Sequence, residues 1–155
     1  MHPDLESSIK DFQRHVGAPP PTWPRVSPEE AKLIKAQAKE LIAASAAFKN
    51  LYKQTGRNVF LRIELMLEEL GEAIEGIGEG DQVKTLDGLV DTAYVVIGTA
   101  TQFDLPFNKA FEEVHRSNMT KSSRGAVSHS GDKGKGAGFS PANIAGILAA
   151  HRAVG

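Results

Sequence analysis

The chain has 155 residues, 41% of them hydrophobic, which is enough to bury one core and too little for two ordinary domains. Its 18 basic and 19 acidic residues give a formal net charge of -1, so we expect no nucleic acid and no membrane as a partner. There is no cysteine, which excludes disulfides, thiolate nucleophiles and cysteine-ligated zinc. The sequence has no N-terminal secretory signal and no apolar run long enough to span a bilayer, so we expect a cytoplasmic protein.

The N-terminal third predicts a short helix, an extended arm and a long helix. Residues 4–15 form an amphipathic pattern, and the prolines among residues 17–26 favour an extended connector. Ser27 is suited to cap a helix, Pro28 to occupy its first position and Glu30 to complete a capping box. The Ala- and Lys-rich sequence that follows predicts that this helix runs to about residue 50.

Four more helices are predicted, at about 59–77, 82–103 and 107–117, and from Ser140-Pro141 to the C-terminus. Between the last two, residues 122–138 are rich in Ser, Gly and Lys and cannot build a core, so we expect a mobile loop. No strand-like alternation is sustained anywhere. We therefore predict an all-α fold, a four-helix-type bundle forming a single domain over residues 1–155. Its accessory parts are an N-terminal helix and arm (1–27), a flexible loop (122–139) and a C-terminal helix.

The predicted helix at 59–77 has an apolar face and an acidic face. The apolar face comprises Ile63, Met66, Leu67, Leu70, Ala73, Ile74 and Ile77. The other side gathers Glu64, Glu68, Glu72, Glu75 and Glu79, while Glu69 lies nearer the apolar edge. Carboxylates three or four residues apart repel one another, so either a cation compensates them or the face is simply solvated.

The next predicted helix, residues 82–103, is apolar nearly all round, so we expect it to be largely buried. Asp87 and Asp91 share one stripe of this helix with Tyr94. No Lys, Arg or His occurs within residues 85–108, so neither aspartate has a cation nearby in the sequence.

Two interpretations of these aspartates follow. Unpaired carboxylates in apolar surroundings normally pair, protonate or bind a metal, and oxygen ligands suit Mg²⁺ or Mn²⁺ better than zinc. In the alternative, Asp87 caps or begins the helix, and Asp91 pairs with a distant basic residue such as Arg57 or Lys121. The acidic helix that precedes this one favours the metal.

Three sequence blocks resemble a known family. They are Glu69-Leu70-Gly71-Glu72 preceded by Glu68, Asp91-Thr92-Ala93-Tyr94, and the stretch FEEVHRSNMTK at 111–121. With FQRHVGAPPP at 12–21, they resemble the MazG-like all-α nucleoside triphosphate pyrophosphohydrolases. This superfamily includes all-α dUTPases, dCTP pyrophosphatases and phosphoribosyl-ATP pyrophosphohydrolases, and some of its members are encoded by phages.

The resemblance implies Mg²⁺-dependent hydrolysis of nucleoside triphosphates, in particular dNTPs, to a nucleoside monophosphate and pyrophosphate. It implies Glu69, Glu72 and Asp91 as metal ligands. Where the family usually has a further glutamate, three residues before Asp91, this chain has Gly88, and we take Asp87 as a stand-in. The loss could instead mean fewer metal ions, a different substrate or weak activity. The alternative function is a non-catalytic helical dimer of the same fold that binds a nucleotide or a protein.

The resemblance also implies roles outside the metal site. Glu68, or alternatively Glu72, would accept the proton of the attacking water. The expected substrate-binding residues are Tyr94, His115, Asn118, Lys121 and Arg124, with Lys133 and Lys135 of the loop as further phosphate contacts. For the loop residues the alternative is a solvated linker, and for His115 an interface or capping role. A homodimer or homotetramer is expected, because the helix that carries Tyr94 and the C-terminal segment IAGILAAH would otherwise leave apolar surface exposed. The resemblance implies the same, since family members build their site beside a subunit interface.

Overall fold

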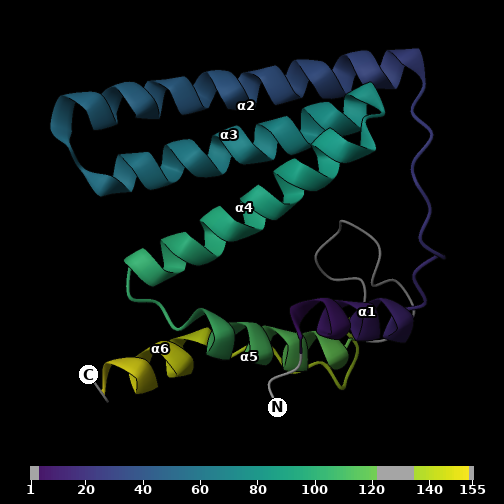
Figure 1. The fold of residues 1–155 in the computed structure, drawn as a ribbon. Helices are drawn as coiled ribbons and strands as arrows, with labels where there is room; N and C mark the ends of the chain where they lie inside the picture. Colours follow the sequence, from purple (N-terminus) through teal and green to yellow (C-terminus); the bar gives the residue numbers. More distant parts are fainter. Residues whose placement is uncertain (1–3, 122–134, 154–155) are drawn as a thin grey trace. The chain divides into compact units, whose positions relative to one another are not determined.

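The structure is a computed structural model that describes residues 4–121 and 135–153. Figure 1 shows its helices, which are α1 (Leu5–His15), α2 (Pro28–Thr55), α3 (Asn58–Glu79), α4 (Gln82–Gln102), α5 (Phe107–Met119) and α6 (Ile144–Arg152). The described residues contain no strand, which confirms the predicted all-α class. They divide into two compact units, which we call the three-helix unit (residues 23–103) and the terminal unit (residues 1–22 and 104–155). In neither described range does a helix combine the length and hydropathy needed to cross a membrane.

In the three-helix unit, α3 packs against α2 on one side and α4 on the other. The predicted capping box at the start of α2 is present, because the Ser27 hydroxyl accepts from the Glu30 amide and the Glu30 carboxylate accepts from the Ser27 amide. The helix continues past the predicted end to Thr55, and Gly56 ends it in the left-handed conformation at φ 66°. Gly56 tolerates this angle because it has no Cβ.

A tight turn joins α3 to α4. Gly80 ends α3 at φ 71°, and the Asp81 carboxylate caps α4 by accepting from the Lys84 amide at 3.0 Å. Asp87 therefore lies in the second turn of α4 and neither caps nor begins the helix. The two helices leave this turn antiparallel and in contact.

Glycines allow the helix backbones of this unit to approach closely. A Cβ added to Gly71 of α3 would lie 2.7 Å from Ile42 of α2, and one added to Gly76 would lie 2.7 Å from the Thr85 hydroxyl oxygen of α4. Contacts this short leave no space for a side chain. The close approach of α3 to its two neighbours thus requires glycine at these positions.

The prediction that α4 is largely buried is wrong for the isolated chain. Its buried stripe consists of the mostly small residues Thr85, Gly88, Val95, Thr99 and Ala100. The opposite side is exposed and apolar, and both Asp87 and Asp91 are exposed. Within its unit α4 packs on α3 alone, which covers one side of the helix.

The terminal unit contains α1, α5 and α6, with α5 packed against the other two. Glu113 organises the junction between α5 and α6, because its carboxylate binds the Arg116 guanidinium at 2.8 Å and accepts from the Asn143 amide. Hydrogen bonds from Arg116 and from that amide lower the pKa of Glu113 to about 2. The prediction that Ser140-Pro141 starts the last helix is wrong: the α6 cap is Asn143, whose side chain accepts from the Gly146 amide.

Candidate functional site

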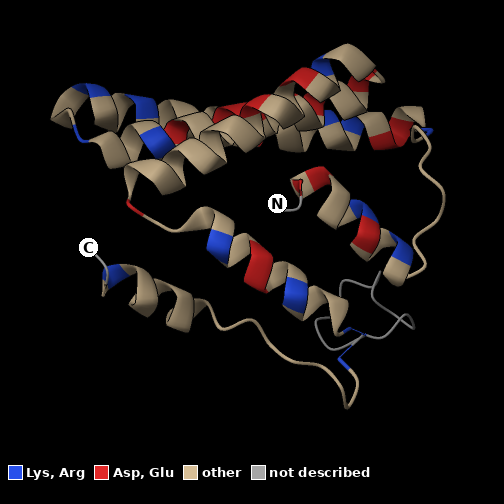
Figure 2. Cartoon of the chain, turned by 60° about the horizontal axis from the view of Figure 1, so that its bottom comes forward, with Lys and Arg blue, Asp and Glu red and all other residues tan. Residues whose placement is uncertain are grey.

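Lysines compensate part of the acidic face of α3. Lys49 of α2 binds Glu64 at 3.3 Å and approaches Glu68 at 3.9 Å. Lys84 of α4 binds Glu75 at 2.7 Å and Glu79 at 3.0 Å. Figure 2 shows the acidic and basic residues along these helices. The compensating charge that we expected for this face is therefore supplied in part by the protein itself.

The Lys49 group includes the most deeply buried carboxylate of the face. Glu64 is only 3% exposed, and it forms a hydrogen bond with Glu68 that, after burial, is the largest cause of a raised Glu68 pKa. The hydrogen bond between Glu64 and Lys49 raises the pKa of Lys49. For Glu64, the alternative of a solvated face is therefore wrong, and the alternative of a compensating cation is confirmed.

Four carboxylates remain without such a partner. In residues 4–121 and 135–153, no side-chain hydrogen bond or ion pair engages Glu69, Glu72, Asp87 or Asp91. They nevertheless lie within electrostatic range of one another. Burial raises the pKa of Glu69, and the negative charges that raise it further belong to Asp91, Glu72, Glu68 and Asp87, in decreasing order. Glu69 is thus the centre of a cluster, which we call the carboxylate cluster, formed by Glu69, Glu72, Asp87 and Asp91.

The carboxylate cluster fits a hard divalent cation by its donor set, since it offers oxygen ligands alone. Its side chains do not already surround a cation position, because no group of three or more carboxylate or imidazole side chains converges in this way within the described ranges. To hold a metal, the side chains would have to turn towards one another. Mutual repulsion opposes that rotation when no cation is present.

The alternative pairing of Asp91 with Arg57 has no support, because the Arg57 guanidinium lies 5.4 Å from the centre of the Phe60 ring. The other suggested partner, Lys121, lies in the terminal unit with its ammonium 5.8 Å from the centre of the Phe12 ring. Within the three-helix unit, Asp91 therefore has no ion-pair partner.

Gly88 lies at a close contact between α3 and α4. A Cβ at this position would lie 2.7 Å from the amide nitrogen and 2.8 Å from the Cα of Ala73. A glutamate there would point at the backbone of α3, so it could not simply join Asp87 and Asp91 on their exposed stripe. The absence of the family glutamate is thus coupled to the packing of the helix pair.

The predicted phosphate contacts of the 111–121 block lie in the terminal unit. The carbonyl oxygen of Lys121 is 2.7 Å from the His15 ring, and His115 and Asn118 are half-buried on α5. Arg124 and Lys133 lie outside the described residues. Lys135 is described, with its ammonium 5.5 Å from the centre of the Phe139 ring. The substrate-binding roles of these residues stay predictions.

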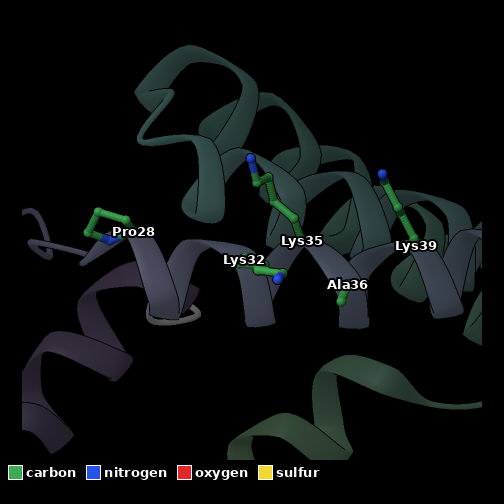
Figure 3. A pocket seen from close by; sticks show the side chains of 5 residues that line it. All are labelled: Pro28, Lys32, Lys35, Ala36 and Lys39. Carbon is green, nitrogen blue, oxygen red and sulfur yellow. The ribbon is translucent and has the colours of Figure 1, made fainter.

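Two of the cavities that described residues line lie on the three-helix unit. The first, of about 290 Å³, lies along α2 and is lined by Pro28, Lys32, Lys35, Ala36 and Lys39 (Figure 3). The hydrogen bond from Lys84 is the largest cause of the lowered Glu75 pKa, and the charges of Lys39 and Lys35 add to it, so part of their charge is already offset. The second, of about 500 Å³, lies between α3 and α4 and is lined by Arg62, Leu65, Tyr94, Val95, Ile97, Gly98, Thr101 and Gln102.

Sequence reasoning missed two functional candidates in this unit, Lys49 and Arg62. Arg62 donates to the Thr99 hydroxyl at 3.0 Å and to the Val95 carbonyl at 2.8 Å, which fixes its guanidinium against α4. Both contacts join helices whose relative register the sequence does not state. The available signal in the sequence was the position of Arg62, a basic residue that lies close to the acidic run of α3.

Residues 47–118 match the family model of phosphoribosyl-ATP pyrophosphohydrolase, which is part of the MazG-like all-α superfamily. The match spans α3, α4 and most of α5, so it contains all four members of the carboxylate cluster. It confirms the resemblance over this segment and supports pyrophosphohydrolase chemistry on a nucleotide. The chain matches no curated protein and no solved structure at a significant level.

Proposed function

We propose that this chain, with its phosphoribosyl-ATP pyrophosphohydrolase-like segment, is a Mg²⁺-dependent nucleoside triphosphate pyrophosphohydrolase that acts on dNTPs. The reaction attaches water to the α-phosphorus, breaks the bond between the α- and β-phosphates, and gives a nucleoside monophosphate and pyrophosphate. Beyond the family match, one observation supports this proposal. Lysines pair with four of the six carboxylates of α3, including Glu68, whereas within the described ranges no ion pair engages a member of the carboxylate cluster.

In the proposed site, Glu69, Glu72 and Asp91 hold the cation, and Asp87 supplements them in place of the missing family glutamate. Bound Mg²⁺, for which Mn²⁺ could substitute, would neutralise the triphosphate and offset the charge that develops on its oxygens. Glu68 is the first candidate for the base that accepts the water proton, and Glu72 is the second. The raised pKa of Glu68 suits a proton acceptor, because a carboxylate with a higher proton affinity is a stronger base.

Mg²⁺ is expected to raise the melting temperature of the protein. Each Mg²⁺ bound by the folded chain relieves repulsion around Glu69, and saturation at 100 times the Kd would add about 2.7 kcal/mol. Differential scanning fluorimetry with Mg²⁺, and with K⁺ at matched ionic strength as a control, measures this shift. Pyrophosphate release from each common NTP and dNTP, with and without Mg²⁺, measures turnover.

These measurements separate the rival functions. A Mg²⁺-induced shift together with release from at least one nucleotide supports the enzyme. A shift caused by a nucleotide without any release points to the non-catalytic binding protein. No release and no shift with Mg²⁺ would refute both the catalytic and the metal proposals.

We also propose that the chain forms a homodimer or homotetramer through the exposed side of α4. Val83, Leu86, Val90 and Tyr94 follow one another at helical spacing and are 80%, 65%, 57% and 80% exposed. Asp87 and Asp91 lie between this apolar face and the contact with α3, so a second copy would enclose the carboxylate cluster.

Sedimentation velocity should detect a species of at least twice 16.6 kDa, and Val90→Glu should shift it towards the monomer. A wild-type monomer at micromolar concentration would contradict the proposal.

A further inference from the structure

The cavity between α3 and α4 lies beside the carboxylate cluster, on the same side of each helix. On α3, Arg62 and Leu65 precede Glu69 by seven and four residues, which places them on its side of the helix. On α4, Tyr94 and Gly98 follow Asp91 by three and seven residues and share its stripe. Because the helices are antiparallel, both stripes lead from the carboxylates into the cavity.

The dimensions of the cavity suit the nucleoside half of a nucleotide. Its volume of about 500 Å³ lies within the range of small-molecule sites, roughly 300–1,000 Å³. The seven residues from Asp91 to Gly98 rise about 10 Å along α4, which is comparable with the reach from a phosphate to the far edge of its base. The walls are mostly apolar, with Leu65, Val95 and Ile97 among them, as a stacked or packed base requires.

Arg62 supplies the charged group among the residues that line this cavity. A guanidinium has five N–H donors, and Arg62 uses one on the Thr99 hydroxyl and one on the Val95 carbonyl. No carboxylate in the described part of the chain forms an ion pair with it. Gly98 lets the side chain lie flat against α4, since a Cβ there would be 3.1 Å from the Arg62 Nη2 atom. Donors therefore remain for a ligand.

We propose that this cavity binds the base and sugar of the substrate, and that Arg62 is a specificity-determining residue that donates to the base. The inference rests on the proposed function. A guanidinium only donates, so Arg62 favours a base edge that presents carbonyl oxygens, as in uracil, thymine or guanine, over one that presents an amino group. The carboxylate cluster holds the phosphate end of the same molecule.

The test compares a nucleoside triphosphate with inorganic tripolyphosphate, which has the phosphates without the nucleoside. Arg62→Met removes the donors, and Thr101→Trp fills the cavity from an exposed position and so has little effect on folding. Both variants should raise KM for the preferred nucleotide at least about tenfold relative to KM for tripolyphosphate, since a hydrogen bond to a charged group contributes about 1.5–3 kcal/mol. Arg62→Met should also reduce the preference for carbonyl-bearing bases. Lys39→Met, in the other cavity, is the control that leaves KM unchanged.

A second measurement does not depend on turnover. In Mg²⁺-free buffer, NMR titration with a nucleoside monophosphate should shift the amide signals around Leu65 and Gly98, and Thr101→Trp should abolish these shifts.

If wild-type protein hydrolyses nucleotides while both variants keep the wild-type KM ratio, the inference fails and the proposed function stands. If nothing is hydrolysed but the monophosphate shifts appear, the proposed function fails and the cavity assignment stands. If the variants change the sedimentation coefficient and not the KM ratio, the cavity holds a second copy and the inference is overturned.

Discussion

Asp91→Asn should reduce pyrophosphate release by at least about 100-fold and abolish the stabilisation by Mg²⁺. Loss of a residue that only supports a metal ligand typically costs 10–100-fold, so loss of a ligand should cost at least the upper value. The fold should persist, because Asp91 is exposed on α4 and makes no side-chain hydrogen bond or ion pair in the described residues. Steady-state kinetics at saturating nucleotide and melting curves with and without Mg²⁺ measure both effects.

The same variant should not destabilise the metal-free protein. Asp91 is the neighbouring charge that most strongly raises the pKa of Glu69, so removing it relieves repulsion within the cluster. In EDTA, the melting temperature of Asp91→Asn should equal or slightly exceed that of the wild type. Glu79→Gln is a matched control, because Glu79 is also a carboxylate of the helix pair but pairs with Lys84 outside the cluster. Full turnover by Asp91→Asn would refute its role as a ligand.

Gly88→Glu should unfold the protein more easily and should not increase turnover, although it restores the residue type usual in the family. The new Cβ would meet backbone atoms of Ala73 at 2.7 and 2.8 Å, and backbone cannot move aside as a flexible side chain can. Overpacking of this kind typically costs about 1–3 kcal/mol of unfolding free energy. Urea denaturation followed by circular dichroism measures the loss.

Paired alanine substitutions isolate the steric cause. In a helix interior without steric conflict, glycine to alanine stabilises by up to about 1 kcal/mol. Gly98→Ala should destabilise less than Gly88→Ala, because its Cβ would meet only the Arg62 guanidinium, at 3.1 Å, and no backbone atom of α3. If Gly88→Ala proved as stable as the wild type, and Gly88→Glu raised activity, the missing glutamate would be a loss of function that Asp87 does not replace.

The sequence predicted a helix end well where residues close in the sequence determine it. The Ser27–Glu30 box sets the start of α2 through contacts within a few residues, whereas Gly56 ends this helix beyond the predicted end at about residue 50. The start of α6 was mispredicted because its approach is held by α5: Arg116 donates to the Ser140 hydroxyl and to the Pro141 carbonyl. Such contacts span more than 20 residues, and no local pattern indicates them.

The candidate site was predictable to a similar extent. Helical periodicity placed Asp87 and Asp91 on one stripe, and the family pattern selected Glu69 and Glu72 from a run of similar residues. The partners of the other glutamates depend on the register of α2 and α4 against α3, which periodicity does not reveal. The burial of α4 was overestimated because an apolar sequence indicates what a helix could bury, whereas the actual burial depends on how many neighbours the chain supplies.

The glycine-mediated contacts between α3 and α4 bear on which ion this helix pair would select. Where backbone touches backbone, at Gly76 and Gly88, the separation of the helices can neither shrink nor readily adapt through side-chain rearrangement. Ca²⁺ accepts more ligands at longer and more variable distances than Mg²⁺, and a frame with little freedom to expand favours the smaller ion. Gly76 and Gly88 would thus influence the size of the ion that binds, although neither residue contacts it.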